Sequence, residues 1–293
     1  MTSEWLLHPL QPFLEFGFMR RALVATLALS LGCAPIGCLL VLRRMSLVGD
    51  AMAHAVLPGA AAGFLLAGLS LPAMSAGGFV AALAVALAAG FVTRSTPQRE
   101  DASFAAFYLI ALALGVLLVS LRGSQIDLMH MLFGSVLAVD DTALIQIAVV
   151  ASLTLWALAL MYRPLVLESF DPGFLRSVRG PGAMAHTLLL VLLVANLVSA
   201  FQALGTLMAV GLMMLPAAAA RFWVADLPRM AALAVAIGAL SGAAGLLLSY
   251  HAELPSGPCI VLVCGAAYIA SVLFGRRDGV VTRRLLAASH LTR

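Results

Sequence analysis

Asp50 and His54 lie four residues apart in the segment LRRMSLVGDAMAHAVLPG, residues 42–59. On a helix this spacing places both side chains on one face. A carboxylate oxygen and an imidazole nitrogen together suit borderline divalent metals such as Zn²⁺ or Mn²⁺. Pro58 has no N–H to bond the carbonyl oxygen of His54, so that carbonyl is free beside the pair. The segment predicts part of a metal site; a proton relay or a hydrogen bond that only fixes helix packing are the alternatives.

The pair lies in a very apolar chain. Of the 293 residues, 63% are hydrophobic and 10% are charged, whereas a soluble domain has about 25% charged residues. This composition indicates a polytopic membrane protein. An ionised Asp near the bilayer centre costs at least about 2.5 kcal/mol. A carboxylate retained in such a segment is therefore a functional candidate by default.

The elements that must position the pair are predicted membrane-spanning helices. Apolar runs near the required length of about 20 residues lie at about 22–42, 50–69, 73–93, 103–121, 142–162, 184–203, 205–222, 230–250 and 258–275. The run at 205–222 is the least certain, so we expect an all-α polytopic membrane protein with eight or nine transmembrane helices. The expected regions are an N-terminal amphipathic segment (1–20), a transmembrane domain (21–276) and a cytoplasmic tail (277–293).

The arginines predict the orientation of these helices. All 17 basic residues are arginine. With nine spans and an outer N-terminus, all of them fall on the inner side except Arg20, Arg21 and Arg122. This positive-inside bias places the C-terminus in the cytoplasm. The excess of basic residues is therefore an orientation signal and does not indicate binding to nucleic acid.

Further polar side chains lie in segments that this orientation places outside. His130 belongs to the partly apolar segment 123–141, and His251 and Glu253 belong to the loop SYHAELPSGPC, residues 249–259. They are weaker candidate metal ligands, and solvated surface side chains are the alternative. Together the acidic residues of these segments would raise the local cation concentration.

The longest polar inner loop is LVLESFDPGFLRSVRGPG, residues 165–182. Asp171 followed by Pro172 is typical of an N-cap with proline at the first helical position. We expect a short helix there that docks on a partner, with an ordinary ordered loop as the alternative. The chain contains no P-loop motif GxxxxGK[ST]. Any ATP-driven work therefore needs another chain.

Five segments resemble the membrane permeases of metal-type ABC importers, which take up zinc or manganese. They are LRRMSLVGDAMAHAVLPG, DLMHMLFGSVLAV, SFDPGFL, GTLMAVGLMMLPAAAARF and LPSGPCIVL. They follow the family's order over about residues 20–275. The resemblance implies a type II ABC importer permease fold, a homodimer in the inner membrane, cytoplasmic ATP-binding subunits and an extracytoplasmic metal-binding protein. The chain itself would have no catalytic centre and no cofactor, only a transported ion.

The resemblance also implies roles for individual residues. Asp50 and His54 match the positions that line the transport path and hold the metal. The segment at about 169–178 matches the coupling helix that docks on the ATPase. Its expected coupling residues are Ser169, Phe170, Asp171 and Arg176. On the outer side, Arg20 and Arg21 are expected to meet acidic residues of the metal-binding protein.

The residues of these motifs favour Zn²⁺ as the transported ion, with a manganese importer permease as the close alternative. A proton-coupled secondary metal transporter would usually show inverted repeats or several paired intramembrane charges. An intramembrane metalloenzyme would need an HExxH-like pair with a general base. The chain has one clear intramembrane pair and no persuasive repeat.

Overall fold

The computed structural model describes residues 11–45, 47–68, 70–121, 139–277 and 279–282. Every regular element in these ranges is a helix. The helices are α1 (Gln11–Glu15), α2 (Gly17–Leu42), α3 (Val48–Ala67), α4 (Leu71–Ser95), α5 (Glu100–Leu121), α7 (Asp141–Leu160), α8 (Tyr162–Phe170), α9 (Pro172–Ser177), α10 (Gly182–Leu204), α11 (Thr206–Arg221), α12 (Leu227–Ala252) and α13 (Ser256–Phe274).

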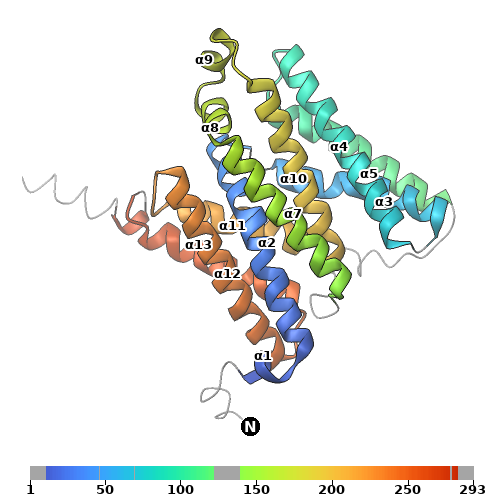
Figure 1. Cartoon of the computed structure of the whole chain (residues 1–293), viewed down its shortest axis with the longest axis vertical. Coiled ribbons are helices and arrows are strands. Elements are labelled where there is room, and N and C mark those ends of the chain that lie inside the picture. Colours follow the sequence, from blue (N-terminus) through green and yellow to red (C-terminus); the bar gives the residue numbers. More distant parts are fainter. Residues whose placement is uncertain (1–10, 46, 69, 122–138, 278, 283–293) are drawn as a thin grey trace, which may run out of the picture.

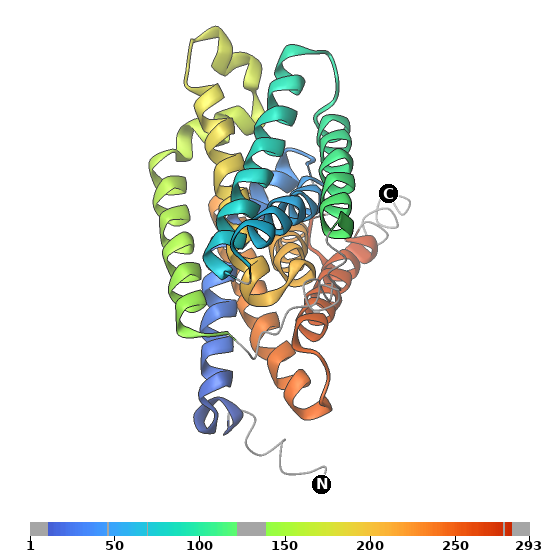
Figure 2. The same cartoon turned by 90° about the vertical axis from the view of Figure 1, so that its right-hand side faces the viewer.

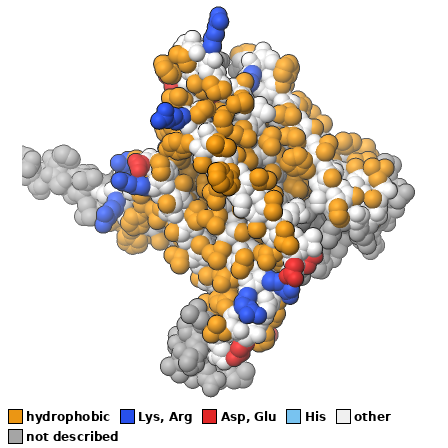
Figure 3. Space-filling model, viewed as in Figure 1, with side chains coloured by type: hydrophobic (Ala, Val, Ile, Leu, Met, Phe, Trp, Pro, Cys, Tyr) orange, Lys and Arg blue, Asp and Glu red, His pale blue; other side chains and the backbone are white. Residues whose placement is uncertain are grey.

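Eight of the described helices are long and apolar enough to cross a membrane: α2, α3, α4, α5, α7, α10, α12 and α13. Helix α11 has 16 residues, fewer than the roughly 20 needed for a full crossing. It corresponds to the run that the sequence marked as least certain. Hydrophobic side chains cover the middle of the visible face, while arginine and acidic side chains lie toward its edges (Figure 3). The prediction of an all-α polytopic membrane protein is confirmed.

The helices form two groups on either side of α10 (Figure 1). Helices α3, α4 and α5 pack against one another, as do α11, α12 and α13, and α2 packs against α11 and α12. Both views place α9 and the α4–α5 connection at one end of the bundle, and α1 with the α12–α13 connection at the other (Figures 1 and 2). The sequence assigned these two ends to the inner and outer sides of the membrane, respectively.

Small residues let the neighbours of α3 approach closely. A Cβ on Gly59 would meet the backbone of Gly77 in α4, and a Cβ on Gly77 would meet the backbone of Gly59. From the other side, a Cβ on Gly115 of α5 would lie 3.1 Å from the nitrogen of Pro58. In lipid no hydrophobic force drives helices together, so they associate through the van der Waals contacts that such close approach allows. The backbone of α3 therefore lies in close contact with both α4 and α5.

Candidate metal site

The Asp50 carboxylate and the His54 imidazole lie beside each other on α3. Asp50 Oδ1 is 3.7 Å from His54 Nε2, so the two side chains share a face as the spacing predicted. The distance exceeds that of a direct hydrogen bond. Both atoms therefore keep lone pairs available for a third group, provided that the imidazole is neutral and its proton is on Nδ1.

Both side chains are accessible in the single chain. The Asp50 side chain is 61% exposed and that of His54 is 31% exposed. Since α3 begins at Val48, Asp50 lies in its first turn, where the free N–H groups of a helix favour a negative charge. An exposed carboxylate on a membrane helix requires water, a cation or another protein beside it.

Tyr108 of α5 packs on the His54 ring. The ring centroids are 6.0 Å apart and the planes differ by 28°. His54 Nδ1 is buried and has no hydrogen-bond partner in the described part of the chain. The packing turns Nε2 toward Asp50 and Nδ1 toward the interior. Sequence reasoning missed Tyr108, because an aromatic residue in an apolar run carries no signal of its own.

The pair supplies two donors. Within the described ranges, no group of three or more His, Cys, Asp or Glu side chains is placed to hold one metal ion. A transition metal needs four to six ligands. Further ligands must therefore come from water, backbone carbonyls or another chain.

The weaker outer candidates do not join Asp50 and His54. His251 Nδ1 lies 2.8 Å from the carbonyl oxygen of Leu247 in its own helix. Glu253 follows α12 in the left-handed region, with φ 54°. Both lie where α12 meets α13, at the end of the bundle opposite α9 (Figure 2). His130 lies outside the described residues.

The two arginines expected at a docking surface differ in their surroundings. Arg21 Nη1 lies 3.3 Å from Asp141 Oδ1, and both side chains are exposed. This ion pair joins the beginnings of α2 and α7. The Arg20 side chain is exposed and forms no ion pair with the described residues.

The expected short helix is present as α9. Asp171 Oδ1 accepts a hydrogen bond from the N–H of Phe174 at 2.8 Å, so the predicted cap is confirmed. Phe170 and Phe174 are exposed and give this end of the bundle an apolar surface. Arg176 belongs to α9, but its side chain lies outside the described part of the structure.

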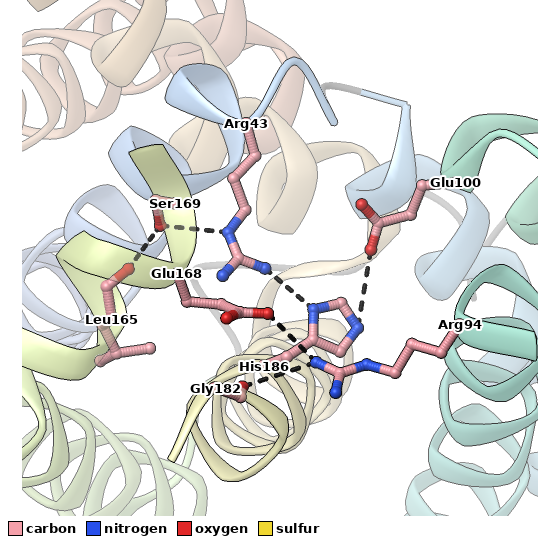
Figure 4. Close-up of polar contacts among 8 residues, drawn as sticks. All are labelled: Arg43, Arg94, Glu100, Leu165, Glu168, Ser169, Gly182 and His186. Atoms are coloured by element: carbon pink, nitrogen blue, oxygen red, sulfur yellow. Dashed lines mark hydrogen bonds and ion pairs between the residues drawn. The ribbon is translucent and has the colours of Figure 1, made fainter. Parts of the chain in front are cut away.

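Next to α8 and α9 lies a charged cluster that the sequence did not predict (Figure 4). Its members are Arg43, Arg94, Glu100, Glu168, Ser169 and His186. Arg43 Nε donates to Ser169 Oγ at 3.1 Å, and its Nη1 lies 2.9 Å from His186 Nδ1. Arg94 Nη2 donates to Glu168 Oε1 at 3.2 Å. His186 Nε2 lies 3.5 Å from Glu100 Oε1.

The side chains of His186 and Glu168 are only 7% and 10% exposed, whereas that of Arg94, at the edge of the cluster, is 40% exposed. Burial lowers the pKa of Arg43 from its ordinary value, and the nearby carboxylates of Glu100 and Glu168 oppose that shift. In the sequence these arginines look like the other inner arginines. Their contacts within the cluster depend on which helices meet, so composition alone gives no sign of these contacts.

The chain matches the family model described as the ABC 3 transport family over residues 15–275. It is 35% identical over 271 residues to the manganese transport system membrane protein MntC of Halalkalibacterium halodurans, covering 92% of this chain and 91% of that protein. It is 35% identical over 257 residues to the manganese import system permease protein ScaB of Streptococcus parasanguinis, covering 88% and 90%. With the probable iron transport system membrane protein of Haemophilus influenzae it shares 32% over 273 residues, covering 93% and 98%.

A solved structure extends this likeness to three dimensions. A chain of PsaBC from Streptococcus pneumoniae, solved in complex with Fab, aligns with a TM-score of 0.80 and 30% identity, covering 98% of this chain and 100% of that chain. The alignment spans the whole helical bundle, which confirms the predicted permease fold. The chain therefore belongs to the ABC 3 transport family and is a multi-pass membrane permease subunit of a metal ABC importer, in which a separate subunit is the ATPase.

Proposed function

We propose that this chain conducts a divalent first-row transition metal ion past the Asp50–His54 pair, with Mn²⁺ as the favoured cargo. The observation that carries the proposal is an oxygen and a nitrogen donor on one accessible face of α3, 3.7 Å apart. Carboxylate oxygen suits Mn²⁺, and imidazole suits Fe²⁺ and Zn²⁺. The sequence motifs favoured zinc as the cargo. The relatives described above are named for manganese or iron, so we favour manganese.

We infer that a second copy of the chain completes the site. Asp50 is 61% exposed in the single chain, and two donors fall short of what a transition metal needs. In a homodimer with two-fold symmetry the same patch of each copy meets its equivalent. If α3 lies at that interface, two carboxylates and two imidazoles face one path, and water supplies any remaining ligands.

In this proposal the α9 end of the bundle is cytoplasmic. Helix α9 docks on the ATP-binding subunit, and Ser169, Phe170, Asp171 and Arg176 belong to that contact region. The capped helix and the exposed side chains of Phe170, at the end of α8, and Phe174 support the assignment. The positive-inside bias supports a C-terminus on the same side of the inner membrane. The boundaries at 1–20, 21–276 and 277–293 remain proposals.

The opposite end then receives an extracytoplasmic metal-binding protein. Arg20 is its proposed contact, while Arg21 is already paired with Asp141. Released metal passes the outer mouth, where His130, His251 and Glu253 remain weaker candidate ligands. It exchanges part of its hydration shell for Asp50 and His54. ATP binding and hydrolysis in the partner then displace α9 and open the path inward.

The test is metal uptake by the permease reconstituted in proteoliposomes with its ATP-binding subunit and its metal-binding protein. Asp50→Asn and His54→Ala should each lower Mn²⁺ uptake by about tenfold or more, because each removes a ligand. Asp226→Asn is the matched control, since Asp226 is exposed and pairs only with Arg229 of the next turn, at 3.3 Å, among the described residues. Uptake at the parental rate by both site variants would refute the site. Competition among Mn²⁺, Fe²⁺ and Zn²⁺ identifies the cargo.

A further inference from the structure

The charged cluster connects the coupling region with the end of α2. Glu168 and Ser169 are near the end of α8, directly before Asp171 and α9. Ser169 accepts from Arg43 at 3.1 Å and donates to the carbonyl oxygen of Leu165 at 2.6 Å. Glu168 accepts from Arg94 at 3.2 Å. Any displacement of α8 with α9 therefore acts directly on these two arginines.

From Arg43 a short, hydrogen-bonded turn leads to the metal-site helix. The N–H of Arg43 donates to Leu39 at 3.0 Å and that of Met45 to Leu40 at 2.9 Å. The Met45 side chain is buried, and α3 begins at Val48. The N–H of Val48 in turn donates to the carbonyl oxygen of Met45 at 3.2 Å, so a shift of Arg43 is passed to the first turn of α3, which carries Asp50.

A second route runs through α4 and α5. Arg94 lies in the last turn of α4, and Glu100 is the first residue of α5. Glu100 is tied into the cluster through His186 at 3.5 Å. About two helical turns farther along α5, Tyr108 packs on the His54 ring. Helix α5 thus begins in the charged cluster, and α3 begins five residues after the cluster member Arg43.

The cluster also has unpaired groups that a second arrangement can use. Arg43 Nη2 and Glu168 Oε2 are buried and have no hydrogen-bond partner in the described part of the chain. A buried donor and a buried acceptor left unpaired are each unfavourable. A displacement that pairs them removes that penalty, so the cluster favours discrete arrangements over continuous deformation.

We propose that Arg43 and Arg94 are positioning residues that transmit displacement of α8 and α9 to α3 and α5, and thereby couple ATP hydrolysis to movement of the metal site. This inference rests on the proposed function, in which α9 docks on the ATPase and Asp50 and His54 hold the metal. It adds the mechanical connection between those two regions. That connection depends on the charges and hydrogen bonds of the cluster. Variants of the cluster should therefore lower the metal transported per ATP without lowering the amount of metal bound.

The experiment measures Mn²⁺ transported per ATP hydrolysed by the complete complex in proteoliposomes. Arg43→Gln should lower this ratio by about tenfold, in the range of coupling energies measured within charged networks. Basal ATP hydrolysis and Mn²⁺ bound per complex should stay within about twofold of the parental values. Arg229→Gln, which removes an exposed arginine paired with Asp226, should leave all three quantities unchanged.

A charge exchange provides a second, independent measurement. Arg94→Glu and Glu168→Arg should each lower the transported metal per ATP, and the double variant should recover much of the loss because the ion pair is restored in reverse. A role limited to folding would lower assembly, basal hydrolysis and transport together. That pattern in both Arg43→Gln and the exchange series, or a parental ratio in Arg43→Gln, would overturn the inference.

Failure of the underlying proposed function gives a different pattern. If α9 does not dock on the ATPase, Asp171→Ala leaves basal and stimulated hydrolysis unchanged. If Asp50 does not hold the metal, Asp50→Asn leaves the bound Mn²⁺ unchanged. If both of these variants behave as proposed while Arg43→Gln transports a parental amount of metal per ATP, then the inference alone is wrong.

Discussion

The imidazole of His54 and the phenol ring of Tyr108 are stacked, with centroids 6.0 Å apart and planes 28° apart. The two residues come from different helices, α3 and α5. Because the stack limits rotation of the imidazole, it keeps Nε2 directed toward Asp50, 3.7 Å away. Tyr108 therefore acts on the proposed metal through His54.

The stack gives a prediction about affinity. Tyr108→Ala removes the ring contact, which is worth about 0.5–1.5 kcal/mol. The Kd of the complex for Mn²⁺, measured by isothermal titration, should therefore rise by about two- to twelvefold. Tyr108→Phe keeps the ring and is the matched control, with an expected Kd near the parental value. An equal loss of affinity in both variants would assign the effect to the hydroxyl group and contradict the role of stacking.

The cap of α9 gives a prediction about coupling. Asp171→Ala removes the acceptor for the Phe174 N–H, 2.8 Å away, and loss of such a cap costs about 1 kcal/mol. For a helix of six residues that cost is enough to fray the proposed docking surface. We expect weaker binding of the ATP-binding subunit and fewer ions transported per ATP.

The matched control at this position is Asp171→Asn, which retains an oxygen that can cap the helix. It should transport at close to the parental rate. The binding of the ATP-binding subunit to the permease in nanodiscs can be measured directly for both variants. If Asp171→Asn is as impaired as Asp171→Ala, the negative charge matters and the cap alone is not the explanation.

The helices were predictable from the sequence because hydropathy and span length are local properties. Each apolar run corresponds to one described helix, and the weakest run became the short helix α11. The shared face of Asp50 and His54 follows from the helical period alone. The N-cap at Asp171 follows from a dipeptide, which is again local.

What could not be predicted depends on which helices meet. Tyr108 and His54 are far apart in the sequence, and nothing in either apolar run selects the other as its neighbour. Arg43 and Arg94 looked like orientation signals, since positive-inside counting treats every inner arginine alike. Their contacts with α8 and, for Arg43, with α10 depend on tertiary packing. The motifs also could not identify the transported metal, because Asp and His side chains bind several divalent ions.

The contact between α3 and α4 gives a prediction about stability. A Cβ on Gly59 would meet the carbonyl group of Gly77, so Gly59→Ala must push the two backbones apart. Overpacking of this kind costs about 1–3 kcal/mol. We expect a lower apparent Tm of the detergent-purified permease. Gly265→Ala is the matched control, because nothing lies within 4 Å of a Cβ at Gly265; equal Tm values for the two variants would contradict the close packing.

The last prediction distinguishes Arg20 from Arg21, at the end of the bundle that we propose is outside. Arg21 is held by Asp141 at 3.3 Å, whereas the exposed Arg20 side chain forms no ion pair with the described residues. A charge at the rim of an interface acts mainly on the association rate and its salt dependence. Arg20→Ala should therefore slow association of the metal-loaded binding protein several-fold at low salt, with the difference shrinking as salt is raised.

Surface plasmon resonance on the permease in nanodiscs measures both effects, with Arg21→Ala expected to change the rate less. A larger effect at Arg21 than at Arg20 would show that the partner displaces Asp141, and Arg21 would then be the docking contact.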